Sequence, residues 1–267
     1  MPQPSGLITL LTDFGDRDYF VASMKGVILN INPRATIIDL SHHVSPHSVE
    51  SAAYLLKSCY RYFPEGTVHV AVVDPGVGTR RPSLVVKTAR YYFLGPDNGL
   101  FSYIFDEEDE VEVREVENQQ YRLESVGHTF DGRDLFAPSA AWLTKGVPAS
   151  SFGRVIHDPM RFSIIEPSRQ GNRLVGRIEH VDRFGNLISN LTLQHLEEVH
   201  SSVTKQRPLS VRIGAQIIEG LVANYSEGKA EQPSALINSD GRLEIFVKEA
   251  SAADLLKVGK GARIDVS

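Results

Sequence analysis

Four short segments combine carboxylates with glycine, and they are the parts of the sequence best suited to bind a small polar ligand. They are residues 12–18 (TDFGDRD), 74–81 (DPGVGTRR), 129–134 (TFDGRD) and 182–186 (DRFGN). Glycine lets a ligand approach the backbone closely. A carboxylate can hold ribose hydroxyls or an ammonium group, and a carboxylate beside arginine can orient a water molecule. None of the four segments contains a strong nucleophile, so they favour ligand binding and water positioning over covalent catalysis.

Other chemistries lack their usual motifs. The sequence has no GxGxxG after its first strand, no Walker A loop and no HExxH, which removes the main support for dinucleotide binding, nucleoside-triphosphate hydrolysis and zincin chemistry. The adjacent His42 and His43 are either metal ligands or, as we favour, a pair in a turn at a strand end. One cysteine, Cys59, excludes a disulfide framework and a cysteine-based zinc site. We expect no metal.

Length and charge set broad limits. The 267 residues suit one large domain or two modest ones, and the net charge of −5 gives no general attraction to nucleic acid or an anionic membrane. The apolar runs are short and interrupted, and the first residues lack the pattern of a signal peptide. The expectation is a cytoplasmic protein with a small-molecule partner, without nucleic-acid or membrane partners.

The first part of the chain alternates between strand and helix patterns. Apolar runs at residues 8–12, 35–40 and 68–73 predict strands, and helical spacing predicts helices over residues 18–31 and from Ser48 onward. This order predicts a mostly parallel sheet with helices on both faces.

Carboxylates stand where these predicted strands end. Asp13 and Asp74 follow the first and third strands, and Asp39 is near the end of the second. Each one alone is explained by a turn or a helix N-cap. Three together favour a ligand site, because open parallel sheets bind ligands at the carboxyl ends of their strands.

The second part of the chain has a different pattern. Short alternating runs predict strands, and one short helix is expected over residues 251–256. The predicted strands are residues 174–181, 209–213, 235–237 and 243–247. We therefore expect an α/β domain over residues 1–158 and a smaller β-rich domain over residues 159–267. The acidic run at 106–117 is expected to be a solvated edge or loop.

Seven segments, in order along almost the whole chain, carry a family resemblance. They are ITLLTDFGDRDYFVASMKGVI, DLSHHVSPHSVESAAYLL, VAVVDPGVGT, LGPDNGLFS, TFDGRDLFAP, VDRFGNLISN and INSDGRLEIFV. Together they resemble the SAM hydroxide adenosyltransferase family, relatives of the bacterial fluorinase and chlorinase. The resemblance implies a Rossmann-like N-terminal domain and a barrel-like β-rich C-terminal domain. It also implies a homotrimer whose sites lie between the N-terminal domain of one subunit and the C-terminal domain of a neighbour.

The resemblance implies a reaction as well. Water attacks C5′ of S-adenosyl-L-methionine (SAM), the substrate, and releases adenosine and methionine without a further cofactor. A sulfonium departs as a neutral thioether, so the protein must bind the cation, exclude bulk water and aim one water molecule along the C5′–S axis.

In the N-terminal domain the resemblance implies a nucleoside-binding group. Asp13 is expected to bind the ribose hydroxyls, with Asp18 nearby. His47 stands where the halogenases carry tryptophan, and Asn98 is a further lining residue. Phe130 and Gly132 complete this group.

In the C-terminal domain the resemblance implies a second group of binding residues. They are Asp182, Phe184, Asn186, Tyr225, Ser239 and Val247. The two aromatic residues are candidates to pack on adenine. The three polar residues match positions that hold the methionine and adenosine ends.

The family's water-activating residues are an aspartate, an arginine and a histidine. Asp74 and Arg81 match the first two, but Asp131 replaces the histidine. Because a carboxylate donates a hydrogen bond only when protonated, three alternatives stay open. Asp74 and Asp131 share a proton and position a water, His128 reaches the pocket instead, or the chain binds SAM or adenosine and turns over poorly.

Use of a halide is the weaker alternative. The halogenases carry tyrosine where this chain has Asp74, and a carboxylate repels a halide in a dry pocket. Gly132 replaces the serine of fluorinases, so it argues only against fluorination.

Overall fold

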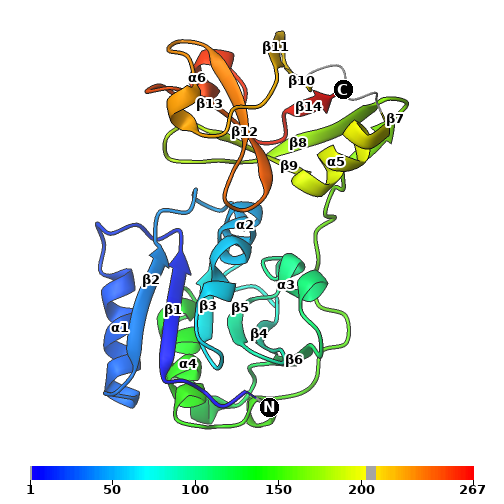
Figure 1. Cartoon of the computed structure of the whole chain (residues 1–267). Helices are drawn as coiled ribbons and strands as arrows, with labels where there is room; N and C mark the ends of the chain where they lie inside the picture. Colours follow the sequence, from blue (N-terminus) through cyan, green and yellow to red (C-terminus); the bar gives the residue numbers. More distant parts are fainter. Residues whose placement is uncertain (1, 203–208) are drawn as a thin grey trace. The chain divides into compact units, whose positions relative to one another are not determined.

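The N-terminal part of the protein is built on a mostly parallel sheet. The computed structural model describes residues 2–202 and 209–267, and the chain divides into two compact units, one ending at Ile164 and one beginning at Ile165. The strands of the first unit are β1 (Leu7–Thr12), β2 (Thr36–Ser41), β3 (Val68–Val72), β4 (Ser83–Lys87), β5 (Tyr92–Pro96) and β6 (Glu112–Glu115). Their order is β2-β1-β3-β5-β4-β6. The pairings among β2, β1, β3 and β5 are parallel, whereas β4 runs antiparallel to β5 and β6 (Figure 1).

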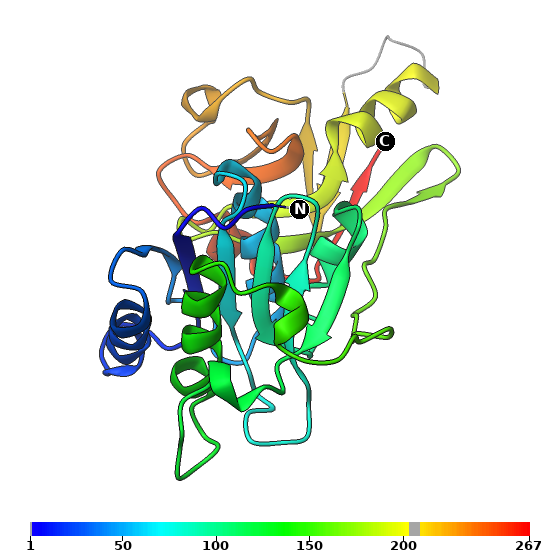
Figure 2. The same ribbon diagram turned by 90° about the horizontal axis from the view of Figure 1, so that it is seen from below.

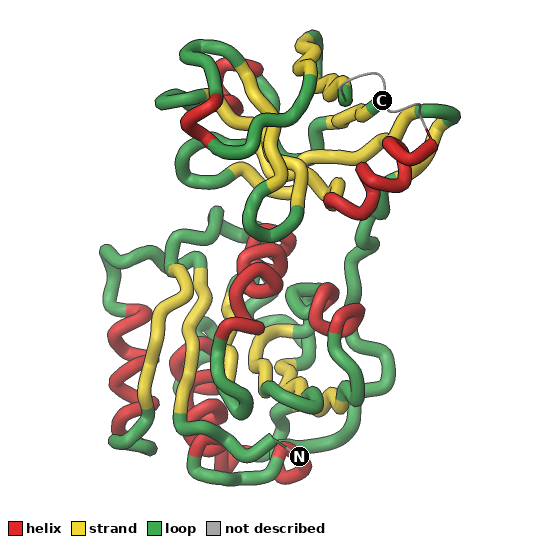
Figure 3. Tube along the Cα trace, in the orientation of Figure 1, coloured by secondary structure: helices red, strands yellow, loops and turns green. Residues whose placement is uncertain are grey.

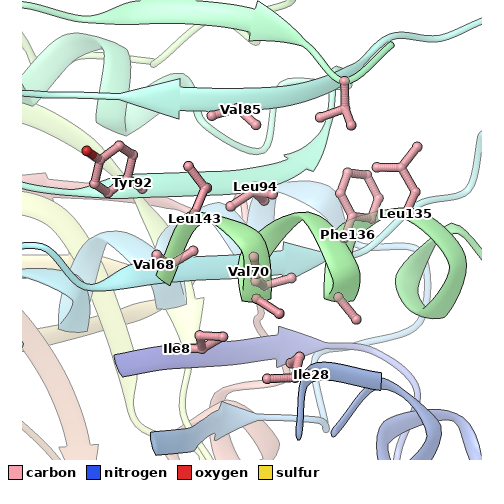
Figure 4. Close-up of a cluster of buried hydrophobic side chains, with 14 of the residues drawn as sticks. Ile8, Ile28, Val68, Val70, Val85, Tyr92, Leu94, Leu135, Phe136 and Leu143 are labelled. Carbon is pink, nitrogen blue, oxygen red and sulfur yellow. The ribbon is translucent and has the colours of Figure 1, made fainter. Parts of the chain in front are cut away.

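Helices cover both faces of this sheet (Figure 2). They are α1 (Phe20–Ile31), α2 (Val49–Cys59), α3 (Ser102–Glu107) and α4 (Ala137–Thr144), with short helical turns at Tyr60–Tyr62, Gln119–Tyr121, Gly132–Phe136 and Ala149–Ser151. Strand β3 shows why two layers form, because its side chains alternate between the faces. Val68 and Val70 pack with α1 and α4 (Figure 4), whereas Ala71 packs with α2 and α3.

The C-terminal unit is an antiparallel β-barrel that is almost closed. Its strands are β7 (Ser168–Gln170), β8 (Arg173–Val181), β9 (Leu187–Thr192), β10 (Ser210–Ile213), β11 (Gln216–Glu219), β12 (Pro233–Ile237), β13 (Arg242–Val247) and β14 (Arg263–Val266), and its helices are α5 (Leu193–Ser202), a turn at Tyr225–Glu227 and α6 (Ala252–Leu256) (Figure 3). The strand order is β11-β10-β14-β8-β9-β13-β12. Just after β11, Val222 N donates to Ala235 O of β12 at 2.9 Å, so the first and last strands of this order approach each other and enclose the core.

The fold class agrees with the expectation from sequence. The predicted strands at residues 8–12 and 68–73 are β1 and β3, and the C-terminal strands predicted from alternation are β8, β10, β12 and β13. The predicted short helix is α6, which begins after Ser251, whose hydroxyl accepts the Asp254 amide at 3.1 Å. In the described residues, no helix combines the length and the apolar character that crossing a membrane requires.

One histidine lies inside the first unit. His69, on β3, is fully buried between aromatic rings, and Phe93 stacks on it with centroids 5.2 Å apart. Its Nδ1 contacts Thr9 Oγ1 at 2.8 Å, and Nε2 has no hydrogen-bond partner among the described residues. Burial lowers the pKa of His69 from 6.5 to about 3, because a charged imidazole would lose its hydration there.

His69 should therefore make the fold sensitive to acid. The unfolded chain binds a proton on His69 below pH 6.5 and the folded chain does not until about pH 3. Stability is thus complete above pH 6.5 and falls by about 1.4 kcal/mol per pH unit as the pH drops through this window. Urea unfolding at several pH values measures the slope. The variant Thr9→Val/His69→Phe should flatten it, and an unchanged slope would show that other groups cause the loss.

Candidate active site

Candidate ligand-binding residues of the first unit lie where its parallel strands end. Asp13 directly follows β1, and its Oδ2 accepts the backbone amide of His47 at 2.9 Å. His47 has a φ of 64°, a conformation that costs a non-glycine residue free energy. Asn98 follows β5 and donates from Nδ2 to Val73 O at 2.9 Å. The structure thus gives His47 and Asn98 roles in fixing the edge of the sheet.

A guanidinium is held between two carboxylates at the same edge. Arg81 Nε donates to Asp74 Oδ1 at 2.8 Å, and its Nη2 donates to Asp74 Oδ2 and, at 2.7 Å, to Asp131 Oδ2. The three side chains are only 10%, 5% and 15% exposed for Arg81, Asp74 and Asp131. The paired, charge-assisted bonds fix the plane of the guanidinium and with it both carboxylates.

The reversed strand explains how one loop supplies two of these groups. Strand β3 ends at the carboxyl edge, and β4 begins there because it runs the other way. Asp74 and Arg81 therefore both lie in the short loop between them. Arg81 Nη1 also donates to Ser83 Oγ at 2.8 Å, which ties the guanidinium to the start of β4.

Asp131 reaches the cluster from the segment before α4. The next residue, Gly132, is buried, and a Cβ there would lie 3.1 Å from the Phe130 ring and 3.2 Å from Met24 Sδ and the Phe14 ring. Phe130 in turn packs edge-on against Phe14, with centroids 5.8 Å apart. Gly132 is thus required for close packing, and Phe130 belongs to an aromatic cluster beside the site.

Asp131 also lines a cavity of about 240 Å³ in the first unit. His128 lines the same cavity, so it is near enough to Asp131 to remain a candidate for the role of the family's histidine. Arg133 and Asp134 form a local ion pair, with Nε and Nη2 donating at 2.6 and 2.9 Å. Asp18 lies exposed in the turn before α1.

The C-terminal unit contains a larger pocket of about 760 Å³. Its lining residues are Asp182, Phe184, Asn186, Tyr225, Ser226, Phe246, Val247, Lys248, Glu249, Ala250 and Ser251. Most of the expected C-terminal binding residues therefore share one pocket. Ser239 is not among them, because it lies exposed in the turn between β12 and β13.

Asp182 organises the turn that forms one wall of this pocket. Its Oδ1 accepts the amides of Phe184 and Asn186, each at 2.8 Å, and its Oδ2 accepts Asn186 Nδ2 at 2.9 Å. Gly185 has a φ of 81°, and a Cβ there would lie 2.1 Å from Ser251 Oγ. The turn presents the Phe184 ring, which is 75% exposed, to the pocket.

Tyr225 also lines this pocket, with an aromatic ring whose hydroxyl is held in place. Its ring meets Phe246 edge-on with centroids 4.9 Å apart, and its Oη donates to the buried Glu244 Oε1 at 2.6 Å. Burial, and then the Glu244 carboxylate, raise the pKa of Tyr225. Asn238 Nδ2 donates to the other Glu244 oxygen at 3.0 Å.

Several of these residues were not found from sequence. Phe246 and Glu244 lie in a strand whose alternation predicts only which side chains face the core. Ser226, Lys248 and Glu249 carry no local motif. In the described part of the chain, no three His, Cys, Asp or Glu side chains are grouped as a metal would require.

Two family models match the chain in order. The model of the SAM hydroxide adenosyltransferase N-terminal domain matches residues 8–153, and that of the C-terminal domain matches residues 176–265. The chain belongs to the SAM hydroxide adenosyltransferase family. Its segments 74–81 and 129–134, which meet at Arg81, lie in the N-terminal domain of the family, and the 760 Å³ pocket lies in the C-terminal domain.

Relatives in this family span nearly the full chain. An (R)-S-adenosyl-L-methionine hydrolase of Methanocaldococcus jannaschii is 34% identical over 94% of this chain and 92% of its own length. A fluorinase of Actinoplanes sp. is 29% identical over 98% of this chain and 97% of its own. The crystal structure of an uncharacterized conserved protein from Thermotoga maritima is 33% identical, with a TM-score of 0.89, and covers 97% of this chain and 99% of its own.

Proposed function

We propose that this family member hydrolyses SAM to adenosine and L-methionine. The observation that carries the proposal is the Arg81 guanidinium held between Asp74 and Asp131. Relatives named (R)-S-adenosyl-L-methionine hydrolase, at 31–34% identity, support the same reaction. We extend to this chain the (R) sulfonium epimer that their names give.

The reaction needs a positioned water molecule and little else. The water oxygen forms a bond to C5′ while the C5′–S bond breaks. The electron pair of the broken bond stays on sulfur, which becomes the thioether sulfur of methionine. One water proton passes to a carboxylate and from there to solvent. Arg81 holds the carboxylates of Asp74 and Asp131 in place, which is an entropic contribution to the rate. The Asp131 oxygen that does not face Arg81 is the candidate proton acceptor.

The charge of this cluster favours water over halides. Two carboxylates and one guanidinium give the cluster a formal net charge of −1 when both carboxylates are ionised. Such a cluster attracts the sulfonium cation and repels chloride or fluoride, and the low exposure of its side chains limits screening. A halide-dependent reaction is therefore the weaker candidate.

The experiment follows both products and the origin of the new oxygen. Purified protein is incubated with each sulfonium epimer of SAM in water enriched in oxygen-18, and products are separated by chromatography. We expect equal amounts of adenosine and methionine from the (R) epimer, with the label on the 5′-hydroxyl. Intact SAM with saturable binding would instead identify a SAM-binding protein of low turnover.

Phe184 offers a test of the pocket that spares the fold. Because its ring is 75% exposed, Phe184→Ala should leave the melting temperature unchanged. Loss of a stacking surface should weaken adenosine binding by about 10- to 100-fold, as base stacking is worth about 1–3 kcal/mol. Calorimetry measures this, with the similarly exposed Tyr62→Ala of the other unit as control. Unchanged affinity would remove Phe184 from the adenine site.

Subunit mixing tests the homotrimer with shared sites that we propose. Asp74→Asn disables the N-terminal group, and Ala250→Trp fills the C-terminal pocket that Ala250 lines. Each variant alone should be inactive. Co-expressed with two affinity tags, hybrid trimers should regain about one third of the wild-type rate, since one of the three sites in each hybrid combines two intact halves in a cyclic trimer. No recovery in hybrids, or a monomer by light scattering, would contradict shared sites.

A further inference from the structure

The loop after β1 and the loop after β2 are tied to each other at the edge of the sheet. Gly15 N donates to His42 O at 2.7 Å, and Val44 N donates to Thr12 O at 3.3 Å. His47 N donates to Asp13 Oδ2. The position of the Asp13 carboxylate therefore depends on how the two loops are held together.

The side chain of His42 lies at the centre of this junction. It is only 11% exposed, and its Nδ1 contacts Thr12 Oγ1 at 2.9 Å. Its Nε2 lies 3.0 Å from Asp39 Oδ1, an electrostatic contact that is not aligned as a hydrogen bond. The other Asp39 oxygen accepts Lys25 Nζ of α1 at 2.5 Å. Because each ring nitrogen already faces a polar neighbour, His42 is poorly placed to bind a metal or to act on substrate directly.

The chemistry of these groups gives the chain of contacts one direction. The nearby Asp39 carboxylate would repel a lone pair on Nε2, so we assign the proton of a neutral His42 ring to Nε2, which leaves Nδ1 as an acceptor. The Thr12 hydroxyl must then donate to Nδ1. Its oxygen accepts the amide of Phe14 at 3.2 Å, and Phe14 is the residue directly after Asp13. The order Phe14 to Thr12 to His42 to Asp39 thus fixes the backbone on both sides of Asp13.

We propose that His42 is a positioning residue for the nucleoside half of the site, where it acts through Thr12 to set the place of the Asp13 carboxylate. The inference rests on the proposed function, in which Asp13 holds the ribose hydroxyls. His42 makes no contact with the reacting atoms, so its loss should weaken binding of the nucleoside and leave the chemical step almost unchanged.

Two substitutions by amide residues distinguish the roles of the two His42 ring nitrogens. The amide of His42→Asn overlaps Nδ1 and keeps a partner for Thr12, whereas that of His42→Gln overlaps Nε2 and keeps only the Asp39 contact. Thr12→Val, which keeps shape and removes the hydroxyl, should behave like His42→Gln. The probe is adenosine, followed by calorimetry, together with KM and kcat for SAM.

We expect His42→Gln and Thr12→Val to raise the Kd for adenosine and the KM for SAM about tenfold, the usual worth of one hydrogen bond, with kcat within about threefold. His42→Asn should stay within about threefold of wild type on both. Unchanged adenosine affinity in His42→Gln, or equal losses in both amide variants that follow their melting temperatures, would overturn the inference. Failure of the wild type to bind adenosine or to turn over SAM would instead overturn the proposed function.

Discussion

Replacing Arg81 by methionine should reduce SAM hydrolysis by about 100- to 1,000-fold and also destabilise the first unit. We expect the rate to fall because the guanidinium fixes the two carboxylates that we propose position the water, and electrostatic preorganisation of this kind contributes about 2.7–4 kcal/mol in enzymes. Stability falls by about 3–5 kcal/mol because Asp74 and Asp131 remain buried without a counter-charge. Their side chains are only 5% and 15% exposed.

The two effects of Arg81→Met can be separated. Adding Asp74→Asn removes one of the uncompensated charges, so the double variant should regain part of the free energy of unfolding in urea titrations and none of the turnover. Arg81→Lys keeps the charge and loses the paired geometry, so it should fold well and remain slow. If Arg81→Met alone hydrolysed SAM within about tenfold of the wild-type rate, Arg81 would have no essential role in the reaction.

Asp131 should be needed for turnover. Asp131→Asn keeps the shape and loses the proton acceptor, so kcat should fall by about 100-fold or more. Asp131→His restores the family pattern and should stay active. Because neutral imidazole accepts a proton only above a pKa of about 6.5, activity of Asp131→His should decline as the pH drops below that value.

The measurement is kcat between pH 5 and 9, with product formation followed by chromatography. His128→Ala is the matched comparison, since His128 lines the same cavity as Asp131. An inactive His128→Ala together with an active Asp131→Asn would transfer the role of proton acceptor to His128.

Much of the fold followed from local patterns. The buried strands β1 and β3 are nearly continuous apolar runs, interrupted by Thr9 and His69, and the C-terminal strands alternate, so both kinds are visible in sequence. The reversal of β4 is not visible, because a short apolar strand looks the same in either direction. The acidic run at 106–117, predicted to be a solvated edge or loop, does include the outer strand β6, where Glu112 meets Lys87 and Arg114. The prediction was wrong for Glu108, which is buried and accepts Tyr60 Oη and Arg90 Nη2, each at 2.9 Å.

The site was predictable as a set of residues, but the individual contacts were not. The spacing of Asp74 and Arg81 said nothing of the paired bonds between them. Asp182, expected to hold substrate, uses its carboxylate on its own turn. Glu244 accepts the Tyr225 hydroxyl and Phe246 packs on its ring. Both lie far from Tyr225 in sequence and share no motif with it.

The loop between β3 and β4 has a consequence for the order in which the site assembles. Asp74 and Arg81 are seven residues apart, whereas Asp131 and Arg81 are separated by fifty. Closing the longer loop costs about 2 kcal/mol more chain entropy than closing the shorter one. A fluctuation that releases the segment before α4 therefore removes Asp131 first and leaves the Asp74–Arg81 pair intact. Catalysis would then stop while most of the sheet remains folded, so on gradual heating inactivation should precede the loss of secondary structure.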